Sequence, residues 1–224
     1  MSTSLKKSKG ETTRTLILET ALRLFRERGY EETTMRLIAE EADVALGNAY
    51  YYFRSKDDLV HAFYERIQLA QLAACEGIFL TEKTLRGRLT ALLRAHFAIC
   101  QPYQRMFVSL FRIAADPQNS LNPFNAETAG VRNQCIDQFR VLVEGSDEKI
   151  PDDLRAELPY LLWLYHMGIV LFWIYDSSPG YLRTYRLIEL STEIIANLIG
   201  LASMPLLLPL RKSALKLVAS VRDI

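Results

Sequence analysis

The chain has 224 residues, which is enough for one or two domains with a sizeable hydrophobic core. Half of its residues are hydrophobic and 24% are charged, a composition that excludes an intrinsically disordered protein. Its 27 Lys and Arg residues nearly balance its 26 Asp and Glu residues. This balance argues against a general nucleic-acid coat, because non-specific DNA affinity grows with the number of phosphates that are neutralised.

Helical periodicity dominates the sequence, and we find no sustained alternation of the kind that predicts β-strands. The first predicted helix covers about residues 13–28 and ends at Gly29, since glycine suits the left-handed position that follows a helix. Thr33 or Thr34 is the predicted N-cap of a second, short helix. The N-terminal segment is therefore expected to be mainly helical from about residue 13 onward.

A third short helix is predicted at about residues 46–53, directly after a tight turn at Asp43. Ser55 and Asp58 then form a capping-box-like start for a fourth, long helix. Two short helices joined by a few residues are typical of the helix-turn-helix unit, which places its second helix in the major groove of DNA.

The third predicted helix carries side chains suited to DNA. Leu46 offers an apolar contact to a thymine methyl group, Gly47 permits close backbone approach, and Asn48 can pair with adenine or a phosphate. Tyrosine hydroxyls suit phosphate contacts. The alternative is that the tyrosine run is core, but three consecutive tyrosines cannot all face one core. The predicted DNA-binding residues are Arg36, Leu46, Gly47, Asn48, Tyr50, Tyr51, Tyr52 and Lys56.

Residues 16–56 resemble the DNA-binding domain of the TetR family of bacterial transcriptional repressors. The matching segments are ALRLFRERGYEETTMRLIAEEADV, GNAYYYF and SKDDL. Two positions depart from the family pattern. Asp43 stands where a turn glycine is common, and Ala45 stands where a Ser or Thr cap is common, so the third helix is expected to lack a side-chain cap.

The resemblance implies an all-α protein with two domains. Residues 1–55 would form a three-helix DNA-binding domain with the helix-turn-helix, and residues 56–224 a larger helical domain that binds a ligand and dimerises. Helical periods in the rest of the chain agree with this division. The further predicted helices cover about residues 85–100, 103–115, 125–143, 158–175 and 181–199, with a terminal amphipathic helix after them.

Large apolar side chains of the middle helices predict a ligand pocket, although aromatics at helical spacing also occur in ordinary cores. The candidate pocket residues are Phe107, Phe111, Phe139, Trp163, His166 and Trp173. His166 is the candidate polar group, because it lies alone in an apolar helix, with a satisfied core histidine as the alternative. Apolar residues cover more than one face of the following helix and predict a homodimer surface. They are Leu187, Leu190, Ile194, Ile195, Leu198 and Ile199.

Several other classes of protein are excluded by missing patterns. Cys75, Cys100 and Cys135 lack the spacing of a zinc or dithiol site, so we predict no metal and no cofactor. We read them as buried reduced thiols, with a thiol sensor as the alternative. HExxH, GxSxG and phosphate-loop motifs are absent, so we expect no enzyme. The N-terminus lacks an apolar signal, and residues 158–175 read as a buried helix rather than a membrane span.

The sequence therefore predicts a cytoplasmic, homodimeric transcriptional repressor with no membrane partner. It would bind a palindromic double-stranded DNA operator and leave it when a small, apolar effector binds. An activator, or a regulator controlled by a protein partner instead of a metabolite, is the alternative.

Overall fold

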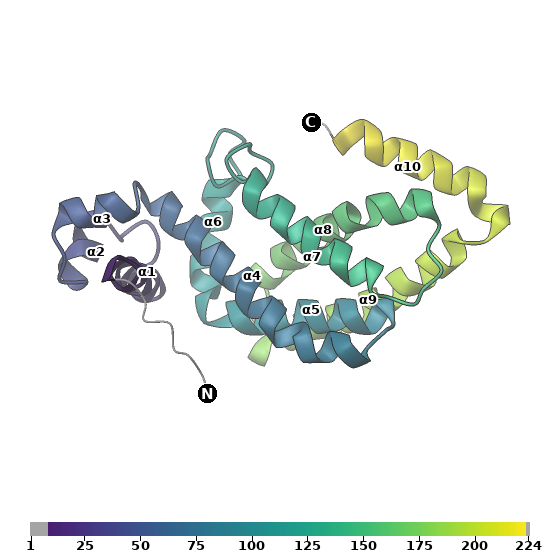
Figure 1. Cartoon of the computed structure of the whole chain (residues 1–224), viewed down its shortest axis with the longest axis horizontal. Helices are drawn as coiled ribbons and strands as arrows, with labels where there is room; N and C mark the ends of the chain where they lie inside the picture. The colour runs from purple at the N-terminus through teal and green to yellow at the C-terminus, as the bar shows by residue number, and fades with distance from the viewer. Residues whose placement is uncertain (1–8, 223–224) are drawn as a thin grey trace. The chain divides into compact units, whose positions relative to one another are not determined.

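The computed structural model describes residues 9–222, and all regular structure within them is helical (Figure 1). The all-α prediction is confirmed. The helices, with η for short 3-10 turns, are α1 Lys9–Arg28, α2 Met35–Glu41, α3 Leu46–Tyr52, α4 Lys56–Thr81, α5 Leu85–Cys100, η1 Gln101–Tyr103, α6 Gln104–Ala114, α7 Ala129–Glu144, α8 Asp152–Ile174, η2 Pro179–Tyr181, α9 Leu182–Ala202, η3 Pro205–Leu207 and α10 Leu208–Arg222.

Contacts divide the chain into two compact units. The first unit contains residues 1–67 and 100–131, and the second contains residues 68–99 and 132–224. The division falls within α4, whose first residues belong to the first unit and whose last residues belong to the second. The predicted domain boundary after residue 55 stays a prediction.

The first three helices form the core of the first unit, because each turns one apolar face inward. Gly29 ends α1 with φ of 90°, and its N–H donates to the carbonyl of Phe25. Thr34 is the N-cap of α2, where its hydroxyl accepts from the N–H of Leu37 at 3.1 Å. Asp43 adopts the left-handed φ of 52° in the turn before α3. The hydrophobic residues buried in α1 and α2 include Ile17, Ala21, Leu24, Phe25, Met35, Ile38 and Ala39.

The predicted capping start of α4 is confirmed in part. The hydroxyl of Ser55 accepts from the N–H of Asp58 at 3.2 Å. The carboxylate of Asp58 reaches back to the N–H of Arg54 at 2.9 Å, one residue before the position that the motif predicts. Both contacts satisfy backbone donors that a helix start leaves free, so they fix where α4 begins.

The segment between α6 and α7 consists of consecutive polar turns. Four side chains at intervals of three residues each accept from the N–H two positions later; they are Asp116, Asn119, Asn122 and Asn125. Such turns compete with helix formation. We predicted that the next helix would begin near residue 125, but α7 begins at Ala129, because these turns continue through residues 125–127.

A buried arginine joins α4 and α5 in the second unit. Arg88 donates to the carbonyls of Phe79 and Glu82, both at 2.8 Å, and its guanidinium lies over the Phe79 ring. The carboxylate of Glu148 accepts from the N–H of Leu85 at 2.7 Å and so caps the start of α5. These contacts satisfy the N–H of Leu85 and the carbonyls of Phe79 and Glu82 at the α4–α5 turn.

A carboxylate also fixes the start of α9. Asp176 is buried and accepts from the N–H and hydroxyl groups of both Ser178 and Thr184, at 2.7–2.9 Å. Burial opposes the charge on Asp176, but these four hydrogen bonds outweigh it and lower its pKa to about 2. Gly180 and Tyr181 complete the turn with positive φ angles of 61° and 57°.

The apolar helix α8 belongs to the second unit and packs against α9 and α10. Within the described residues, α8 is the one helix with the length and hydropathy of a membrane span. Half of its most apolar 18-residue stretch is buried inside the protein. Helices α9 and α10 reach this length and hydropathy only when they are taken together, and the chain bends by 91° between them.

Candidate nucleic-acid interface

Helix α3 exposes one face and buries the other. Tyr51 is 81% exposed and Tyr50 is 48% exposed, whereas Ala49 and Phe53 are buried. Leu46 is exposed at the start of the helix. The two residues that follow it, Gly47 and Asn48, are exposed as well, and Tyr52 is partly buried. The exposed face therefore combines an apolar group, an amide and phenolic hydroxyls.

The turn before α3 has the predicted departure from a capped helix. Ala45 is the N-cap residue, with extended backbone and no side-chain hydrogen bond to the helix. Its carbonyl accepts from the N–H of Asn48 at 2.8 Å, which closes the first turn without a side-chain cap. A cap is commonly worth about 1 kcal/mol, so this short helix depends on its packing against α2.

Lys56 lies at the start of α4 and is held by the first unit itself. Its ammonium donates to the carbonyl of Tyr30 at 2.7 Å and lies 4.2 Å from the centroid of the Tyr30 ring. Partial burial lowers the pKa of Lys56. A phosphate contact from Lys56 would therefore have to share the ammonium with this internal contact.

Asp57, the next residue, connects three segments of the first unit. One carboxylate oxygen accepts from the hydroxyl of Tyr30 and the other accepts from the hydroxyl of Ser120. Burial, followed by the hydrogen bond to Asp57, raises the pKa of Tyr30, so its hydroxyl stays protonated. The segment between α6 and α7 is thereby tied to the start of α4.

Arg36 is exposed on the first turn of α2, where the sequence predicts a DNA contact. An ion pair nearby holds α1 against α2, because Arg23 bonds to Glu41 at 2.7 Å. Arg23 also pairs with Glu27 on its own helix. Seven of the eight predicted DNA contacts thus lie in α2 and α3, while Lys56 begins α4; all belong to the first unit.

The six candidate pocket residues are divided between the two units. Phe107 and Phe111 belong to the first unit, where the Phe107 ring contacts the ring of Phe63. Phe139, Trp163, His166 and Trp173 belong to the second. Within that unit, Phe139 and His166 have ring centroids 6.0 Å apart.

Sequence reasoning missed a second buried histidine beside His166. The ring centroids of His96 and His166 are 4.4 Å apart in an edge-to-face arrangement. Phe97 lies next to His166 and also contacts the ring of Trp173. The helical spacing of His96 from the buried residues Leu89, Leu92 and Cys100 was the signal that could have identified it.

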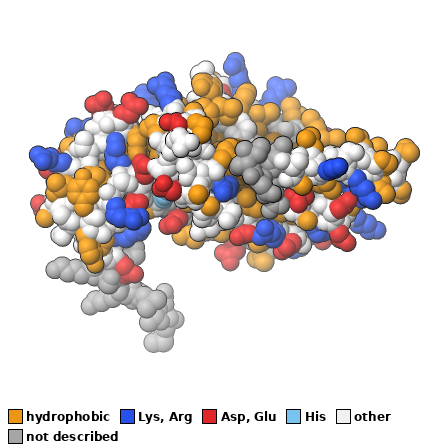
Figure 2. Space-filling view, turned by 90° about the horizontal axis from the view of Figure 1, so that it is seen from above, with side chains coloured by type: hydrophobic (Ala, Val, Ile, Leu, Met, Phe, Trp, Pro, Cys, Tyr) orange, Lys and Arg blue, Asp and Glu red, His pale blue; other side chains and the backbone are white. Residues whose placement is uncertain are grey.

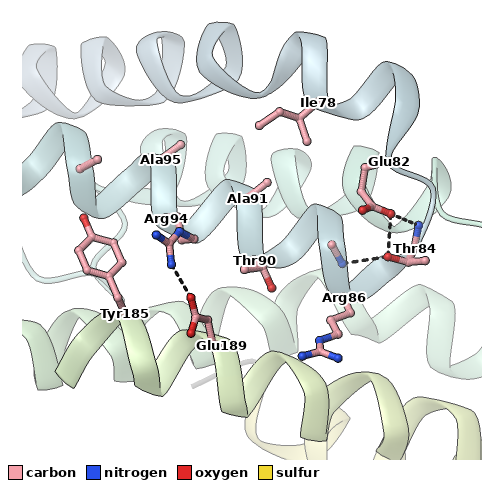
Figure 3. A pocket seen from close by; sticks show the side chains of 12 residues that line it. Ile78, Glu82, Thr84, Arg86, Thr90, Ala91, Arg94, Ala95, Tyr185 and Glu189 are labelled. Atoms are coloured by element: carbon pink, nitrogen blue, oxygen red, sulfur yellow. Dashed lines mark hydrogen bonds and ion pairs between the residues drawn. The ribbon is translucent and has the colours of Figure 1, made fainter. Parts of the chain in front are cut away.

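A separate groove of about 770 Å³ runs along α5, between the end of α4 and α9 (Figure 3). Gly87, Ala91 and Ala95 line it with small side chains. Arg94 bonds to Glu189 at 2.6 Å across it, as the dashed line in Figure 3 marks. None of the six candidate pocket residues lines this groove.

Helix α9 carries an exposed apolar stripe at helical spacing. The stripe consists of Leu190, Ile194, Leu198 and Leu201. Ile199, which we included in the predicted dimer surface, is buried within the unit and faces away from this stripe. Exposed leucines continue beyond α9, and Figure 2 shows hydrophobic side chains beside Lys and Arg at the right-hand end, where η3 and the start of α10 lie.

Comparison with known proteins identifies both parts of the chain. Residues 17–63 match the family model described as bacterial regulatory proteins, tetR family. Residues 88–214, more than half of the chain, match the model of the tetracyclin repressor-like C-terminal domain. The two matches together cover most of the described helices.

Individual relatives are transcriptional regulators. The chain is 26% identical to the HTH-type transcriptional repressor KstR2 of Mycolicibacterium smegmatis over 145 residues, which are 64% of this chain and 70% of that protein. It is 47% identical to the uncharacterized HTH-type transcriptional regulator YuxN of Bacillus subtilis over 45 residues, 20% of this chain. The matched segment covers only 16% of the length of YuxN.

Solved structures share the fold. A TetR transcriptional regulator from Nitrosomonas europaea superposes with a TM-score of 0.65 at 17% identity, covering 82% of this chain and 97% of that one. The helix-turn-helix geometry, the two family models and this shared fold agree with one another. The chain belongs to the TetR family of bacterial regulatory proteins, and it is a helix-turn-helix transcriptional regulator, not an enzyme.

Proposed function

We propose that this regulator is a homodimeric repressor that binds a palindromic operator through α3 and leaves it when a small molecule binds the second unit. The observation that carries the proposal is the exposed face of α3, with Leu46, Asn48 and Tyr51 turned to solvent while Ala49 anchors the helix in the core. The name of KstR2 as a repressor supports the direction of regulation.

The predicted DNA contacts divide into two roles. Leu46 and Asn48 would contact base edges, because apolar and amide groups distinguish base pairs in the major groove. Tyr50, Tyr51 and Lys56 would contact phosphates, which fix the position of the protein on the duplex. The residues from 1 to 66 carry equal numbers of basic and acidic side chains, so DNA affinity would depend on placed groups and not on bulk charge.

The exposed stripe on α9 supports the homodimer. Leu190, Ile194, Leu198 and Leu201 form a continuous apolar face, and such faces on a folded unit mark protein contacts. A two-fold dimer presents two copies of α3 to the two halves of a palindrome. We also propose that the protein acts in the cytoplasm and has no membrane partner, with α8 as a core helix.

Release would follow from a population shift. A ligand that binds one conformation of the second unit more tightly favours that conformation, and a change in the spacing of the two α3 helices weakens their simultaneous contact with DNA. Ligand binding to the second unit remains a proposal, and its candidate residues there are Phe139, Trp163, His166 and Trp173.

The proposal is tested by selecting duplexes from a random-sequence pool with the purified full chain. We expect the selected sequences to contain an inverted repeat. A reporter gene placed behind that repeat should be expressed less when the regulator is present. Higher expression would identify an activator, and a pool without any enriched sequence would contradict the proposed function.

A further inference from the structure

The interior of the second unit contains a set of buried polar side chains. They come from four helices, α4, α5, α7 and α8, and comprise Gln68, Gln71, His96, Gln138 and His166. Buried polar groups in native proteins are almost always hydrogen-bonded, so each of these needs a partner. Gln68 and Gln138 have partners, because Gln68 contacts the Cys135 thiol and Gln138 donates to the carbonyl of Gln68.

The orientation of His96 follows from a chain of hydrogen bonds. The amide nitrogen of Gln71 donates to the carbonyl of Leu92 at 3.2 Å, which turns the amide oxygen toward His96. That oxygen lies 3.3 Å from Nδ1 of His96 and can only accept. The Nδ1 atom of His96 therefore carries the proton, and the ring is fixed in one tautomer.

His166 has no such arrangement. Its side chain is only 7% exposed, and neither ring nitrogen has a hydrogen-bond partner among the described residues. It lies edge-to-face with His96 and is flanked by the rings of Phe97 and Phe139. A buried donor or acceptor without a partner costs about 1–3 kcal/mol, so two such atoms on one ring require an explanation.

The imidazole of His166 is neutral at physiological pH. Burial lowers its pKa to about 4, and burial together with the neighbouring His166 ring lowers the pKa of His96 well below its usual value. A neutral imidazole presents one N–H donor and one nitrogen acceptor. An uncharged group that can both donate and accept a hydrogen bond therefore complements whichever ring nitrogen it reaches.

We propose that His166 binds the head group of the effector, and that the effector is a neutral, hydroxyl-bearing compound with an apolar body. This inference rests on the proposed function, since it names the chemistry of the ligand that would release the DNA. Phe97, Phe139 and Trp173 supply the apolar surroundings for the body. The effector expected from the sequence as simply apolar thus becomes an amphipathic alcohol or phenol.

Other head groups fit His166 less well. A carboxylate can only accept, so it cannot complement the unprotonated ring nitrogen, and its charge would be buried beside a neutral histidine pair at a high cost. A quaternary ammonium group neither donates nor accepts a hydrogen bond and would leave both ring nitrogens as they are. An alkane without a head group would also leave both ring nitrogens without a hydrogen bond. A hydroxyl group can complement either ring nitrogen, because it accepts from the N–H or donates to the unprotonated nitrogen.

The first test measures the thermal stability of the ligand-free protein. His166→Phe and His166→Leu should leave the melting temperature unchanged or raise it, because each removes two nitrogens that have no partner. The matched control is Thr192→Val, which removes a buried hydroxyl that donates to the carbonyl of Ile188 at 2.8 Å and should lower the melting temperature. A loss in both His166 variants as large as in the control would overturn the inference.

The second test measures ligand stabilisation with defined probes. We expect n-decanol or 2-naphthol to raise the melting temperature of the wild-type protein, because a ligand that binds only the folded state stabilises it. Decanoate and decyltrimethylammonium should raise it less. The rise should disappear in His166→Phe. No rise with either alcohol, or an equal rise in wild type and variant, would contradict the assignment.

The repressor function and the role of His166 can be refuted independently of each other. The His166 variants should still bind the duplex selected from the random pool, and the alcohol should release wild-type protein but not the variants. A wild-type protein that selects no duplex would refute the repressor while both thermal tests still decide the role of His166. Conversely, normal DNA binding with negative thermal tests would refute only the ligand assignment.

Discussion

Tyr51 is the most exposed tyrosine of α3, so it is the residue whose contribution to DNA binding can be tested most directly. Its ring contacts the neighbouring Tyr52 ring edge-to-face at 5.0 Å, so the side chain is supported from within the helix while its hydroxyl faces solvent. A hydroxyl in this place would contact phosphate and contribute affinity more than sequence preference.

Tyr51→Ala should weaken DNA binding about five- to tenfold, on the order of one hydrogen bond plus the ring contact. The loss should be similar for selected and random duplexes, because a phosphate contact is independent of sequence. Fluorescence anisotropy with both duplexes measures it. Arg112→Ala, an exposed residue of α6, is the control and should bind as wild type does. A loss restricted to the selected duplex would assign Tyr51 to base contact instead.

Gly145 leaves room for the buried side chain of Arg88. A Cβ atom at Gly145 would lie 2.1 Å from Nη1 of Arg88. The guanidinium group is held in place by its Nε and Nη2 atoms, which donate to the carbonyls of Glu82 and Phe79. Gly145→Ala should therefore lower the free energy of unfolding by about 1–3 kcal/mol, measured by urea denaturation. Gly77→Ala is the opposite control, since nothing lies within 4 Å and alanine favours the helix. Equal stabilisation by both substitutions would show that Arg88 moves freely.

At the scale of elements, the helix boundaries were largely predictable from the sequence. The bounds of α5 and the capped starts of α2 and α4 follow from local patterns, and these agree with the structure. The start of α7 does not, because side-chain acceptors replace helical carbonyls through residue 127. The predicted fourth, long helix is observed as α4, which continues to Thr81.

The candidate sites were predictable to different degrees for a physical reason. Exposed positions in α3 follow from a short local motif, so the face containing Tyr50 and Tyr51 could be read from the sequence. The neighbours of His166 come from separate helices that meet only in the folded unit. No local pattern places His96 beside His166, and the polar interior of the second unit was therefore missed.

The start of α9 gives a prediction about pH at the element scale. The pKa of Asp176 is lowered by its hydrogen bonds from 3.8 to about 2, so its carboxylate stabilises the fold above the unfolded value and loses that effect as the pH falls toward 2. Asp176→Asn should cost about 1–2 kcal/mol at pH 7. The difference from wild type should shrink below about pH 4 and vanish near pH 2. Chemical denaturation across this range measures it, and a difference independent of pH would contradict the role of the charge.

At the scale of the whole molecule, we propose that DNA binding depends on assembly of a dimer. The stripe on α9 would be covered in a dimer, and a charge in its centre would remain unpaired there. Ile194→Lys should therefore shift the protein toward monomer in sedimentation velocity and weaken operator binding by at least tenfold, because one copy contacts only half of the palindrome. Leu80→Lys, at an exposed apolar position on α4, is the control. A dimeric Ile194→Lys protein would place the interface elsewhere.

We propose that a two-fold dimer recognises specific DNA through individually positioned side chains and not through bulk charge. Anisotropy titrations of the full chain with the selected duplex and a scrambled duplex, at several salt concentrations, test it most directly. We predict two chains on each selected duplex, and a preference over scrambled DNA of at least about a thousandfold, with affinity that falls steeply as salt rises. Equal affinity for both duplexes at every salt concentration would contradict the account.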